Sequence, residues 1–104
     1  MERVSFKMKL KKGFAAEYKK RHDDFWPELK ILLKETGIHD YSIFLDPETN
    51  LLFAFLLIEK PERLKDLPAH EIMKKWWTYM KDIMDSNPDH SPVIISLEEV
   101  FYLP

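Results

Sequence analysis

The chain has 104 residues and no cysteine, 33% of its residues are charged, and its formal net charge is -2. A chain of this length predicts one domain spanning residues 1–104. Without cysteine it has no disulfide, thiol nucleophile or thiolate-bound metal, and its small net charge creates no long-range field that would attract nucleic acid. The N terminus alternates instead of forming an apolar block, and no segment reaches the ~20 apolar residues of a membrane span. We therefore expect a soluble, cytoplasmic protein with no nucleic-acid or membrane partner.

The first half of the chain predicts a strand, a broken helix and a second strand. Apolar residues alternate with polar ones between residues 4 and 10, as in a half-buried strand. Apolar residues then recur every three or four positions over residues 14–32, which predicts one face of a helix. Pro27 interrupts this helix because proline lacks the backbone N–H and clashes with the preceding turn, and Gly37 is expected to end its second piece. Renewed alternation over residues 41–45 predicts the next strand.

The second half predicts a strongly apolar strand, two helices and a final strand. The segment LLFAFLLIE, residues 51–59, is apolar on both faces, whereas an antiparallel strand commonly has one polar face. PERLKDL, residues 61–67, predicts a short helix, Pro68 is expected to open a new segment, and helical spacing continues over residues 70–84. VIISLEEVFYL, residues 93–103, predicts the last strand. The resulting order, β-α-β-β-α-β, predicts an α+β protein of the ferredoxin-like class.

The third strand also predicts a partner, because two helices can cover only one face of a four-stranded sheet. An uncovered apolar face would form a patch of the kind that marks an interface, and a symmetric homodimer with apposed sheet faces would bury it. Either face of the strand could be the uncovered one. One face carries Leu51, Phe53, Phe55 and Leu57, and the other carries Leu52, Ala54, Leu56 and Ile58.

Several kinds of site are not supported by the sequence. The chain has only two glycines, so it contains no phosphate-binding loop or dinucleotide motif. The four histidines are far apart, and His70-Glu71 is not followed by a second histidine one turn later. Acidic residues interleave the basic ones around residues 19–22 and 73–75, which favours solvated helix faces over nucleic-acid binding. We expect neither a metal nor another cofactor.

His22 is the strongest candidate for a chemical role. It lies on the apolar stripe of the first helix, where a histidine can also be a simple core residue. Tyr18, four residues earlier, would lie one turn away on the same face. A phenol beside an imidazole can bind hydroxyl groups and move protons, and histidine titrates near neutral pH, as general acid–base catalysis requires.

Trp76, Trp77 and Tyr41 are candidates for binding a polar ligand. Neighbouring helix residues point about 100° apart, so we expect one tryptophan in the core and the other at the edge of a cavity. An indole ring suits the C–H face of a sugar, and its N–H suits a hydroxyl. Tyr41 could be a core residue or another hydroxyl donor, and Glu99 could be a partly buried acid or an edge residue. Together these residues predict proton transfer on a neutral, polyhydroxylated ligand.

Five segments carry a resemblance to a known family: YKKRHDDFWPEL, IHDYSIFLD, NLLFAFLLIE, KKWWTYM and the terminal EEVFYLP. In this order and spacing the chain resembles the L-rhamnose mutarotase family from end to end. The resemblance implies a dimeric ferredoxin-like α+β barrel and an isomerase that needs no cofactor. Its implied reaction interconverts the α and β anomers of L-rhamnose or a related 6-deoxyhexose such as L-fucose. The resemblance matches His22 with the family's proton donor, and it matches the family's sugar-binding residues with Tyr18, Tyr41, Trp76 and Trp77.

Three points stay open within that resemblance. Asp23-Asp24 stands where the family carries an Asn-Pro-like pair, which leaves the helix join undefined and places two more carboxylates near the expected cavity mouth. Ring opening needs a base beside the acid, and a tyrosine, Glu99 or a water molecule could serve. The same fold could instead support a non-catalytic sugar-binding module or a cofactor-independent or heme-degrading monooxygenase.

Overall fold

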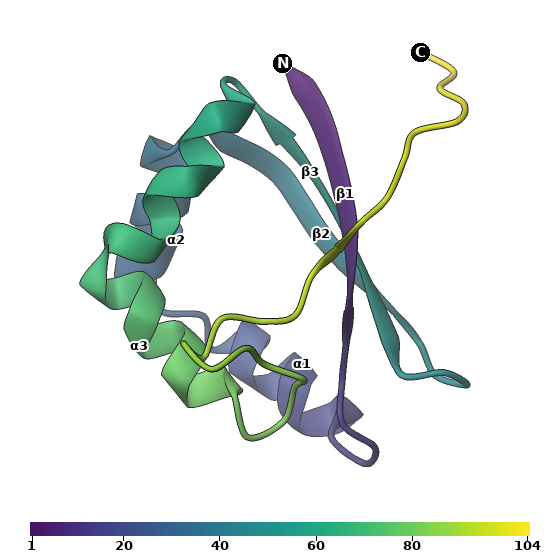
Figure 1. Cartoon of the computed structure of the whole chain (residues 1–104), viewed down its shortest axis with the longest axis vertical. Helices are drawn as coiled ribbons and strands as arrows, with labels where there is room; N and C mark the ends of the chain where they lie inside the picture. Colours follow the sequence, from purple (N-terminus) through teal and green to yellow (C-terminus); the bar gives the residue numbers. More distant parts are fainter.

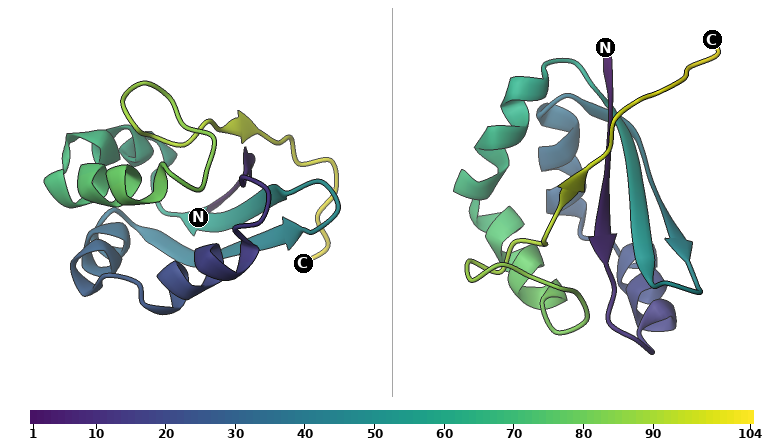
Figure 2. Two further views of the ribbon diagram at one scale, coloured as in Figure 1. Left: turned by 90° about the horizontal axis from the view of Figure 1, so that it is seen from below. Right: turned by 45° about the vertical axis from the view of Figure 1, so that its right-hand side comes forward.

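Four antiparallel strands form a sheet with the helices packed on one of its faces, in a computed structural model that describes residues 1–104 (Figures 1 and 2). The strands lie in the spatial order β2-β3-β1-β4 and are β1 Glu2–Lys9, β2 Ile38–Asp46, β3 Leu51–Ile58 and β4 Ile95–Ser96. The helices are α1 Ala15–Asp23, α2 Pro27–Glu35, the 3₁₀ helix η1 Pro61–Ala69 and α3 Glu71–Met80. This arrangement confirms the predicted ferredoxin-like β-α-β-β-α-β class. No helix has the length and apolar composition that crossing a bilayer requires.

The burial of alternate residues along β3 decides which face of the sheet is covered. β3 pairs with both β1 and β2, and successive residues of a strand point to opposite faces. The set buried beneath the helices is Leu52, Ala54, Leu56 and Ile58. The open face therefore carries Leu51, Phe53, Phe55 and Leu57. On this open face Phe55 is 45% exposed, and Phe44 on the neighbouring β2 is 62% exposed.

The helix break predicted at Pro27 is confirmed. α1 ends at Asp23, Trp26 is the N-cap residue of α2, and Pro27 opens α2, where its missing N–H removes no helical hydrogen bond. Gly37 follows the end of α2 as predicted, with φ at +93° in the left-handed range that glycine adopts most easily. Both helical pieces contribute buried side chains to the core against the sheet.

The predicted last strand, residues 93–103, is wrong in extent, because only β4 pairs with β1. One further backbone bond, from the Leu97 N–H to the Ser5 carbonyl oxygen at 3.0 Å, continues this contact. Beyond it the chain diverges from β1 (Figure 1) and keeps contact with this strand through the side chain of Arg3, which meets Glu99 and Tyr102. An alternating pattern favours an extended backbone, but a strand also needs an edge with which to pair. The edge of β1 continues past β4 as far as Glu2, but the chain diverges from it, and Val100 is 92% exposed.

Two boundaries on the helical side also differ from the prediction. Pro68 lies inside η1 and does not open a new segment. The helical spacing predicted to residue 84 ends with α3, because the following residues bond to the segment after β1. The Lys11 N–H donates to the Ile83 carbonyl oxygen at 2.8 Å, and Met84 forms a bridge with Leu10. Tertiary pairing therefore replaces the last predicted helical turn.

Candidate active site

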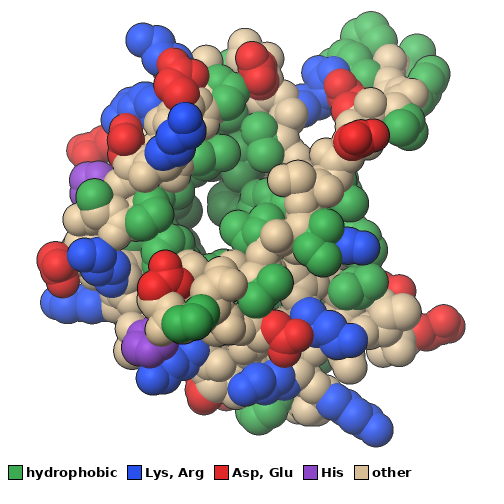
Figure 3. Space-filling model, viewed as in Figure 1, with side chains coloured by type: hydrophobic (Ala, Val, Ile, Leu, Met, Phe, Trp, Pro, Cys, Tyr) green, Lys and Arg blue, Asp and Glu red, His purple; other side chains and the backbone are tan.

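A cavity lies between the helices and the covered face of the sheet, and Figure 3 shows it as a hollow near the centre of the molecule. Its volume is about 1760 Å³, and it opens to solvent. Ligand pockets usually measure roughly 300–1,000 Å³, so a small ligand would occupy only one part of this space. The residues assigned from the sequence to catalysis or sugar binding line the same cavity: Tyr18, His22, Tyr41, Trp76 and Trp77.

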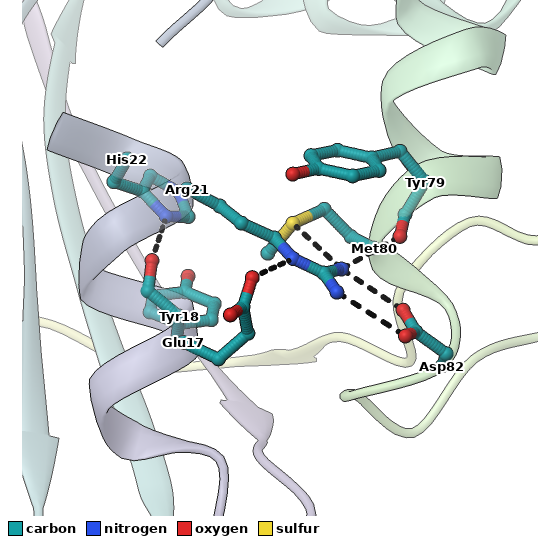
Figure 4. Close-up of polar contacts among 7 residues, drawn as sticks. All are labelled: Glu17, Tyr18, Arg21, His22, Tyr79, Met80 and Asp82. Carbon is teal, nitrogen blue, oxygen red and sulfur yellow. Dashed lines mark hydrogen bonds and ion pairs between the residues drawn. The ribbon is translucent and has the colours of Figure 1, made fainter. Parts of the chain in front are cut away.

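α1 presents Tyr18 and His22 to the cavity on successive turns. Their ring centroids are 4.3 Å apart, as their spacing of four residues along a helix predicts. His22 Nδ1 lies 2.9 Å from the Tyr18 carbonyl oxygen (Figure 4). Because a carbonyl oxygen only accepts hydrogen bonds, Nδ1 carries a proton and donates it to this bond. The bond selects one tautomer and leaves Nε2 as the nitrogen that can gain or release a proton.

Aromatic rings pack around His22. The Trp76 ring of α3 meets it edge-on, with 5.3 Å between centroids, and the Phe25 ring stacks on it at 6.0 Å. Trp76 also contacts Phe25 at 4.9 Å and Trp26 at 5.1 Å. Phe25 and Trp26 come from the join between α1 and α2, so the helix break supplies part of this cluster. Phe25 lines the cavity as well, a role that sequence analysis missed although Phe25 shares the apolar stripe of His22.

Burial controls the protonation of His22, Tyr18 and Tyr41 in the cavity. It lowers the pKa of His22 below its ordinary value of 6.5, against the opposing effects of the Tyr18 carbonyl and the Asp23 carboxylate. It raises the pKa of Tyr18 well above the usual range for a phenol, and the nearby Tyr41 raises it further. Burial also raises the pKa of Tyr41 to about 12. At neutral pH both phenols therefore keep their protons, and the His22 ring is mostly neutral.

Tyr41 lies at an irregularity in β2. The pairing of β2 with β3 shifts between His39 and Ser42, and Asp40 has a φ of +49°. These are the features of a β-bulge, which often re-aims a side chain beside an active site. Tyr41 as a whole residue is 40% exposed, whereas burial raises the pKa of its hydroxyl, so the hydroxyl lies deeper in the protein than the rest of the residue. The bulge depends on the pairing of two strands and has no local signature that sequence analysis used.

Trp76 and Trp77 differ in burial, as their 100° separation on the helix led us to expect. Trp76 is 6% exposed and belongs to the hydrophobic core. Trp77 is only half-buried and packs at the edge of that core. Both rings reach the cavity, so Trp76 combines a core position with a place in the wall, whereas Trp77 is mainly a wall residue.

The carboxylates considered from the sequence do not gather at His22. Glu99 lies outside the cavity, where its Oε1 accepts a hydrogen bond from Arg3 Nε at 2.6 Å. Asp23 lines the cavity and pairs with Lys19 at 3.0 Å, whereas Asp24 is the exposed C-cap of α1 and is not part of the lining. No group of three or more histidine, aspartate or glutamate side chains is arranged to hold a metal ion.

Comparisons with known proteins agree along nearly the whole chain. The family model described as L-rhamnose mutarotase matches residues 3–103. An L-rhamnose mutarotase of Formosa agariphila is 59% identical over 103 residues, and the match covers 99% of each chain. One of Bacteroides thetaiotaomicron is 56% identical over 103 residues, again with 99% of each chain covered. A crystal structure of L-rhamnose mutarotase from Formosa agariphila superposes with a TM-score of 0.94 and 58% identity, and 100% of each chain is covered.

Proposed function

This chain belongs to the L-rhamnose mutarotase family, and from that premise we infer the reaction of its cavity, the interconversion of the α and β anomers of L-rhamnose. The protein is an isomerase. One observation in the structure carries this function: a half-buried histidine of defined tautomer shares a cavity with two protonated phenols and two indole rings. Such a site can move protons and bind hydroxyl groups, as mutarotation requires. The relatives do not favour a non-catalytic sugar-binding module or a monooxygenase.

We propose that His22 is the acid that opens the sugar ring. In its imidazolium form, Nε2–H donates a proton to the ring oxygen while the bond from that oxygen to C1 breaks and the anomeric hydroxyl loses its proton to a base. The open-chain aldehyde rotates about the C1–C2 bond, and the reverse proton transfers close the ring on its other face. Burial disfavours the charged ring of His22 and so lowers its pKa, which makes this proton easier to release.

We propose water as the base that accepts the anomeric proton. Glu99 points away from the cavity toward Arg3, so it does not reach the sugar. Tyr18 and Tyr41 have pKa values raised by burial, which makes them hydrogen-bond donors to sugar hydroxyls rather than bases. We assign the two indole rings, Trp76 and Trp77, to the apolar C–H face of the sugar.

We also propose that two copies of the chain pair through the open faces of their sheets. The Phe44 and Phe55 rings contact each other there, with centroids 6.0 Å apart, and extend the apolar patch across two strands. Exposed apolar residues of the C-terminal segment add to it on the side of the molecule away from the helices (Figures 1 and 2). Surfaces of this kind mark interfaces.

In this proposal residues 1–104 form one domain of each subunit. The cytoplasmic location stays a prediction, which cell fractionation would test.

Saturation-transfer NMR of anomeric exchange tests the proposed reaction. L-rhamnose mutarotates slowly in water, so the α–β exchange rate should rise in proportion to added protein. L-fucose and other 6-deoxyhexoses in the same assay would define the sugar specificity. Saturable sugar binding without faster exchange would indicate a sugar-binding module. A Soret band on titration with heme would indicate a heme-degrading monooxygenase.

A further inference from the structure

Arg21, which precedes His22 on α1, makes more hydrogen bonds through its side chain than any other residue (Figure 4). Its Nη1 and Nη2 donate to the two carboxylate oxygens of Asp82, at 2.9 and 3.2 Å. Nη1 also donates to the Tyr79 carbonyl oxygen at 2.7 Å, and Nε donates to Glu17 Oε2 at 2.7 Å. The guanidinium carbon lies 4.4 Å from the centroid of the Tyr79 ring.

These contacts connect α1 to the C-terminal end of α3. Tyr79 belongs to the last turn of α3, where carbonyl oxygens lack partners within the helix and basic side chains can satisfy them. Glu17 lies one turn before Arg21 and orients the guanidinium from within α1. The Arg21 side chain is only 10% exposed, and turning its plane would break several of these bonds at once. Arg21 therefore constrains both the spacing and the relative direction of the two helices.

Both of these helices carry proposed parts of the sugar site. His22 follows Arg21 directly on α1, and Trp76 lies one turn before Tyr79 and Met80 on α3. The His22 and Trp76 rings meet 5.3 Å apart across the same junction. Arg21 itself does not line the cavity, so it can influence a bound sugar only through these neighbours.

Stability alone does not account for the arrangement. The carboxylate partners Asp82 and Glu17 are 60% and 41% exposed, and ion pairs with exposed partners contribute little to stability. Burying the Arg21 side chain costs desolvation energy. For this reason a buried ion pair is often no more stabilising than apolar residues of similar size. The particular contribution of a guanidinium is directional, because its planar fork matches a carboxylate in one orientation that lysine does not reproduce.

We propose that Arg21 is a positioning residue for the mutarotase reaction, which holds α1 against the end of α3 so that His22 Nε2 and the Trp76 ring face the same sugar. This inference rests on the proposed role of His22 as the acid. Without the guanidinium fork the helices keep their apolar contacts but lose their fixed relative direction. A misplacement of about 1 Å can reduce a rate about 10²-fold, so the loss falls on kcat.

Arg21→Lys and Asp82→Asn test the two sides of this contact, with Arg63→Lys as the matched control. Arg63 also donates to a carbonyl oxygen at a helix C-terminus, that of Glu35 at 2.9 Å, but it lies outside the cavity. Anomer-exchange kinetics should show kcat reduced about 10- to 100-fold in Arg21→Lys, with a smaller reduction in Asp82→Asn and none in Arg63→Lys. KM should change less than kcat, and urea unfolding should show that Arg21→Lys remains folded under the conditions of the assay.

A double-mutant cycle with His22→Ala shows whether Arg21 acts through His22. If it does, adding Arg21→Lys to His22→Ala should cause no further loss of rate. If Arg21→Lys keeps the wild-type kcat while His22→Ala is inactive, the role of Arg21 is overturned and that of His22 stands. The same conclusion follows if Arg21→Lys lowers the rate equally in the wild-type and His22→Ala backgrounds. A fully active His22→Ala would instead overturn the assignment of the acid, and the role of Arg21 with it. If Arg21→Lys does not fold, Asp82→Asn decides by the same criteria, because Asp82 is mostly exposed.

Discussion

The proposed reaction requires His22 Nε2 to carry a proton that it can transfer to the sugar. Nδ1 is bound to the Tyr18 carbonyl oxygen at 2.9 Å, so only Nε2 can exchange a proton with a sugar. His22→Ala should leave the fold intact and lower the anomer-exchange rate by about 10²–10⁴-fold, the usual contribution of a positioned acid–base group. His70→Ala changes a histidine outside the cavity and should keep the rate. Full exchange in His22→Ala would mean that His22 is only a packing residue.

Burial of His22 also predicts how stability depends on pH. The pKa of His22 in the folded chain lies below its ordinary value of 6.5, so the unfolded state binds this proton more readily. The stability that this group contributes is therefore complete above pH 6.5 and is lost as the pH falls through the folded pKa. Urea unfolding between neutral pH and about pH 5 should show a smaller decline in His22→Gln than in the wild type. An identical decline in both proteins would contradict this prediction.

Trp76 and Trp77 should respond differently to truncation. Trp76 is 6% exposed in the core, so Trp76→Ala should lower the free energy of unfolding by about 3–5 kcal/mol. Trp77 is half-buried at the cavity, so Trp77→Ala should mainly raise KM for L-rhamnose, about tenfold for a lost contact of about 1.4 kcal/mol. Urea unfolding and exchange kinetics on both variants measure these effects. An unchanged KM in a folded Trp77→Ala would place Trp77 outside the sugar site.

The candidate residues could be predicted where local helical geometry places them together. Tyr18 and His22 are neighbours in space because they are one turn apart in sequence. The contact of Arg21 with Asp82 joins segments 61 positions apart, and the bulge at Tyr41 depends on how two strands pair. Such long-range features leave no periodic pattern in the sequence, so the support of the site could be found only in the structure.

At the scale of single elements, Gly37 at the end of α2 can be compared with Gly13 before α1. Their φ angles are +93° and +90°. A Cβ at Gly37 would lie 3.3 Å from Glu59 Cβ, whereas nothing lies within 4 Å of one at Gly13. Gly13→Ala should lower the free energy of unfolding by about 1–2 kcal/mol through its left-handed backbone alone, and Gly37→Ala should lower it further. Equal losses in urea unfolding would mean that the Glu59 side chain moves aside freely.

Helices and strands could be predicted where the sequence pattern was regular and the fold also supplied a segment with which the element pairs or packs. β1, β3 and the helix break at Pro27 follow from alternation and from the backbone chemistry of proline. Residues 93–103 alternate as well, yet only β4 forms, because the chain beyond Leu97 diverges from the edge of β1 that is still open. Glu99, expected on that strand, instead pairs with Arg3. The choice between the two apolar faces of β3 likewise depended on where the helices pack, which is not encoded within β3 itself.

At the scale of the whole molecule, the two faces of the sheet have separate roles. The covered face forms a wall of the cavity, to which β3 contributes Leu52 and Leu56. The open face of the same strand carries Phe53 and Phe55 and lies on the side opposite the helices (Figure 1). Pairing through the open face would therefore leave the cavity of each subunit accessible to sugar. The proposed homodimer and the proposed active site are compatible within one fold.

Phe55→Asp should break the proposed homodimer. Phe55 lies near the middle of β3, is 45% exposed, and contacts Phe44 on the open face. In a dimer an aspartate at this position would be buried without a partner, which is strongly unfavourable, and roughly 25 cal/mol would be lost for each Å² of apolar surface left uncovered.

Ile31→Asp is the matched control, because it places the same charge at a 57% exposed residue of α2 on the helical side. In sedimentation equilibrium at micromolar concentration, the wild type and Ile31→Asp should have twice the chain mass of 12.5 kDa, and Phe55→Asp should have the mass of one chain. A single-chain mass for the wild type would refute the homodimer and leave the open apolar face without the partner proposed for it.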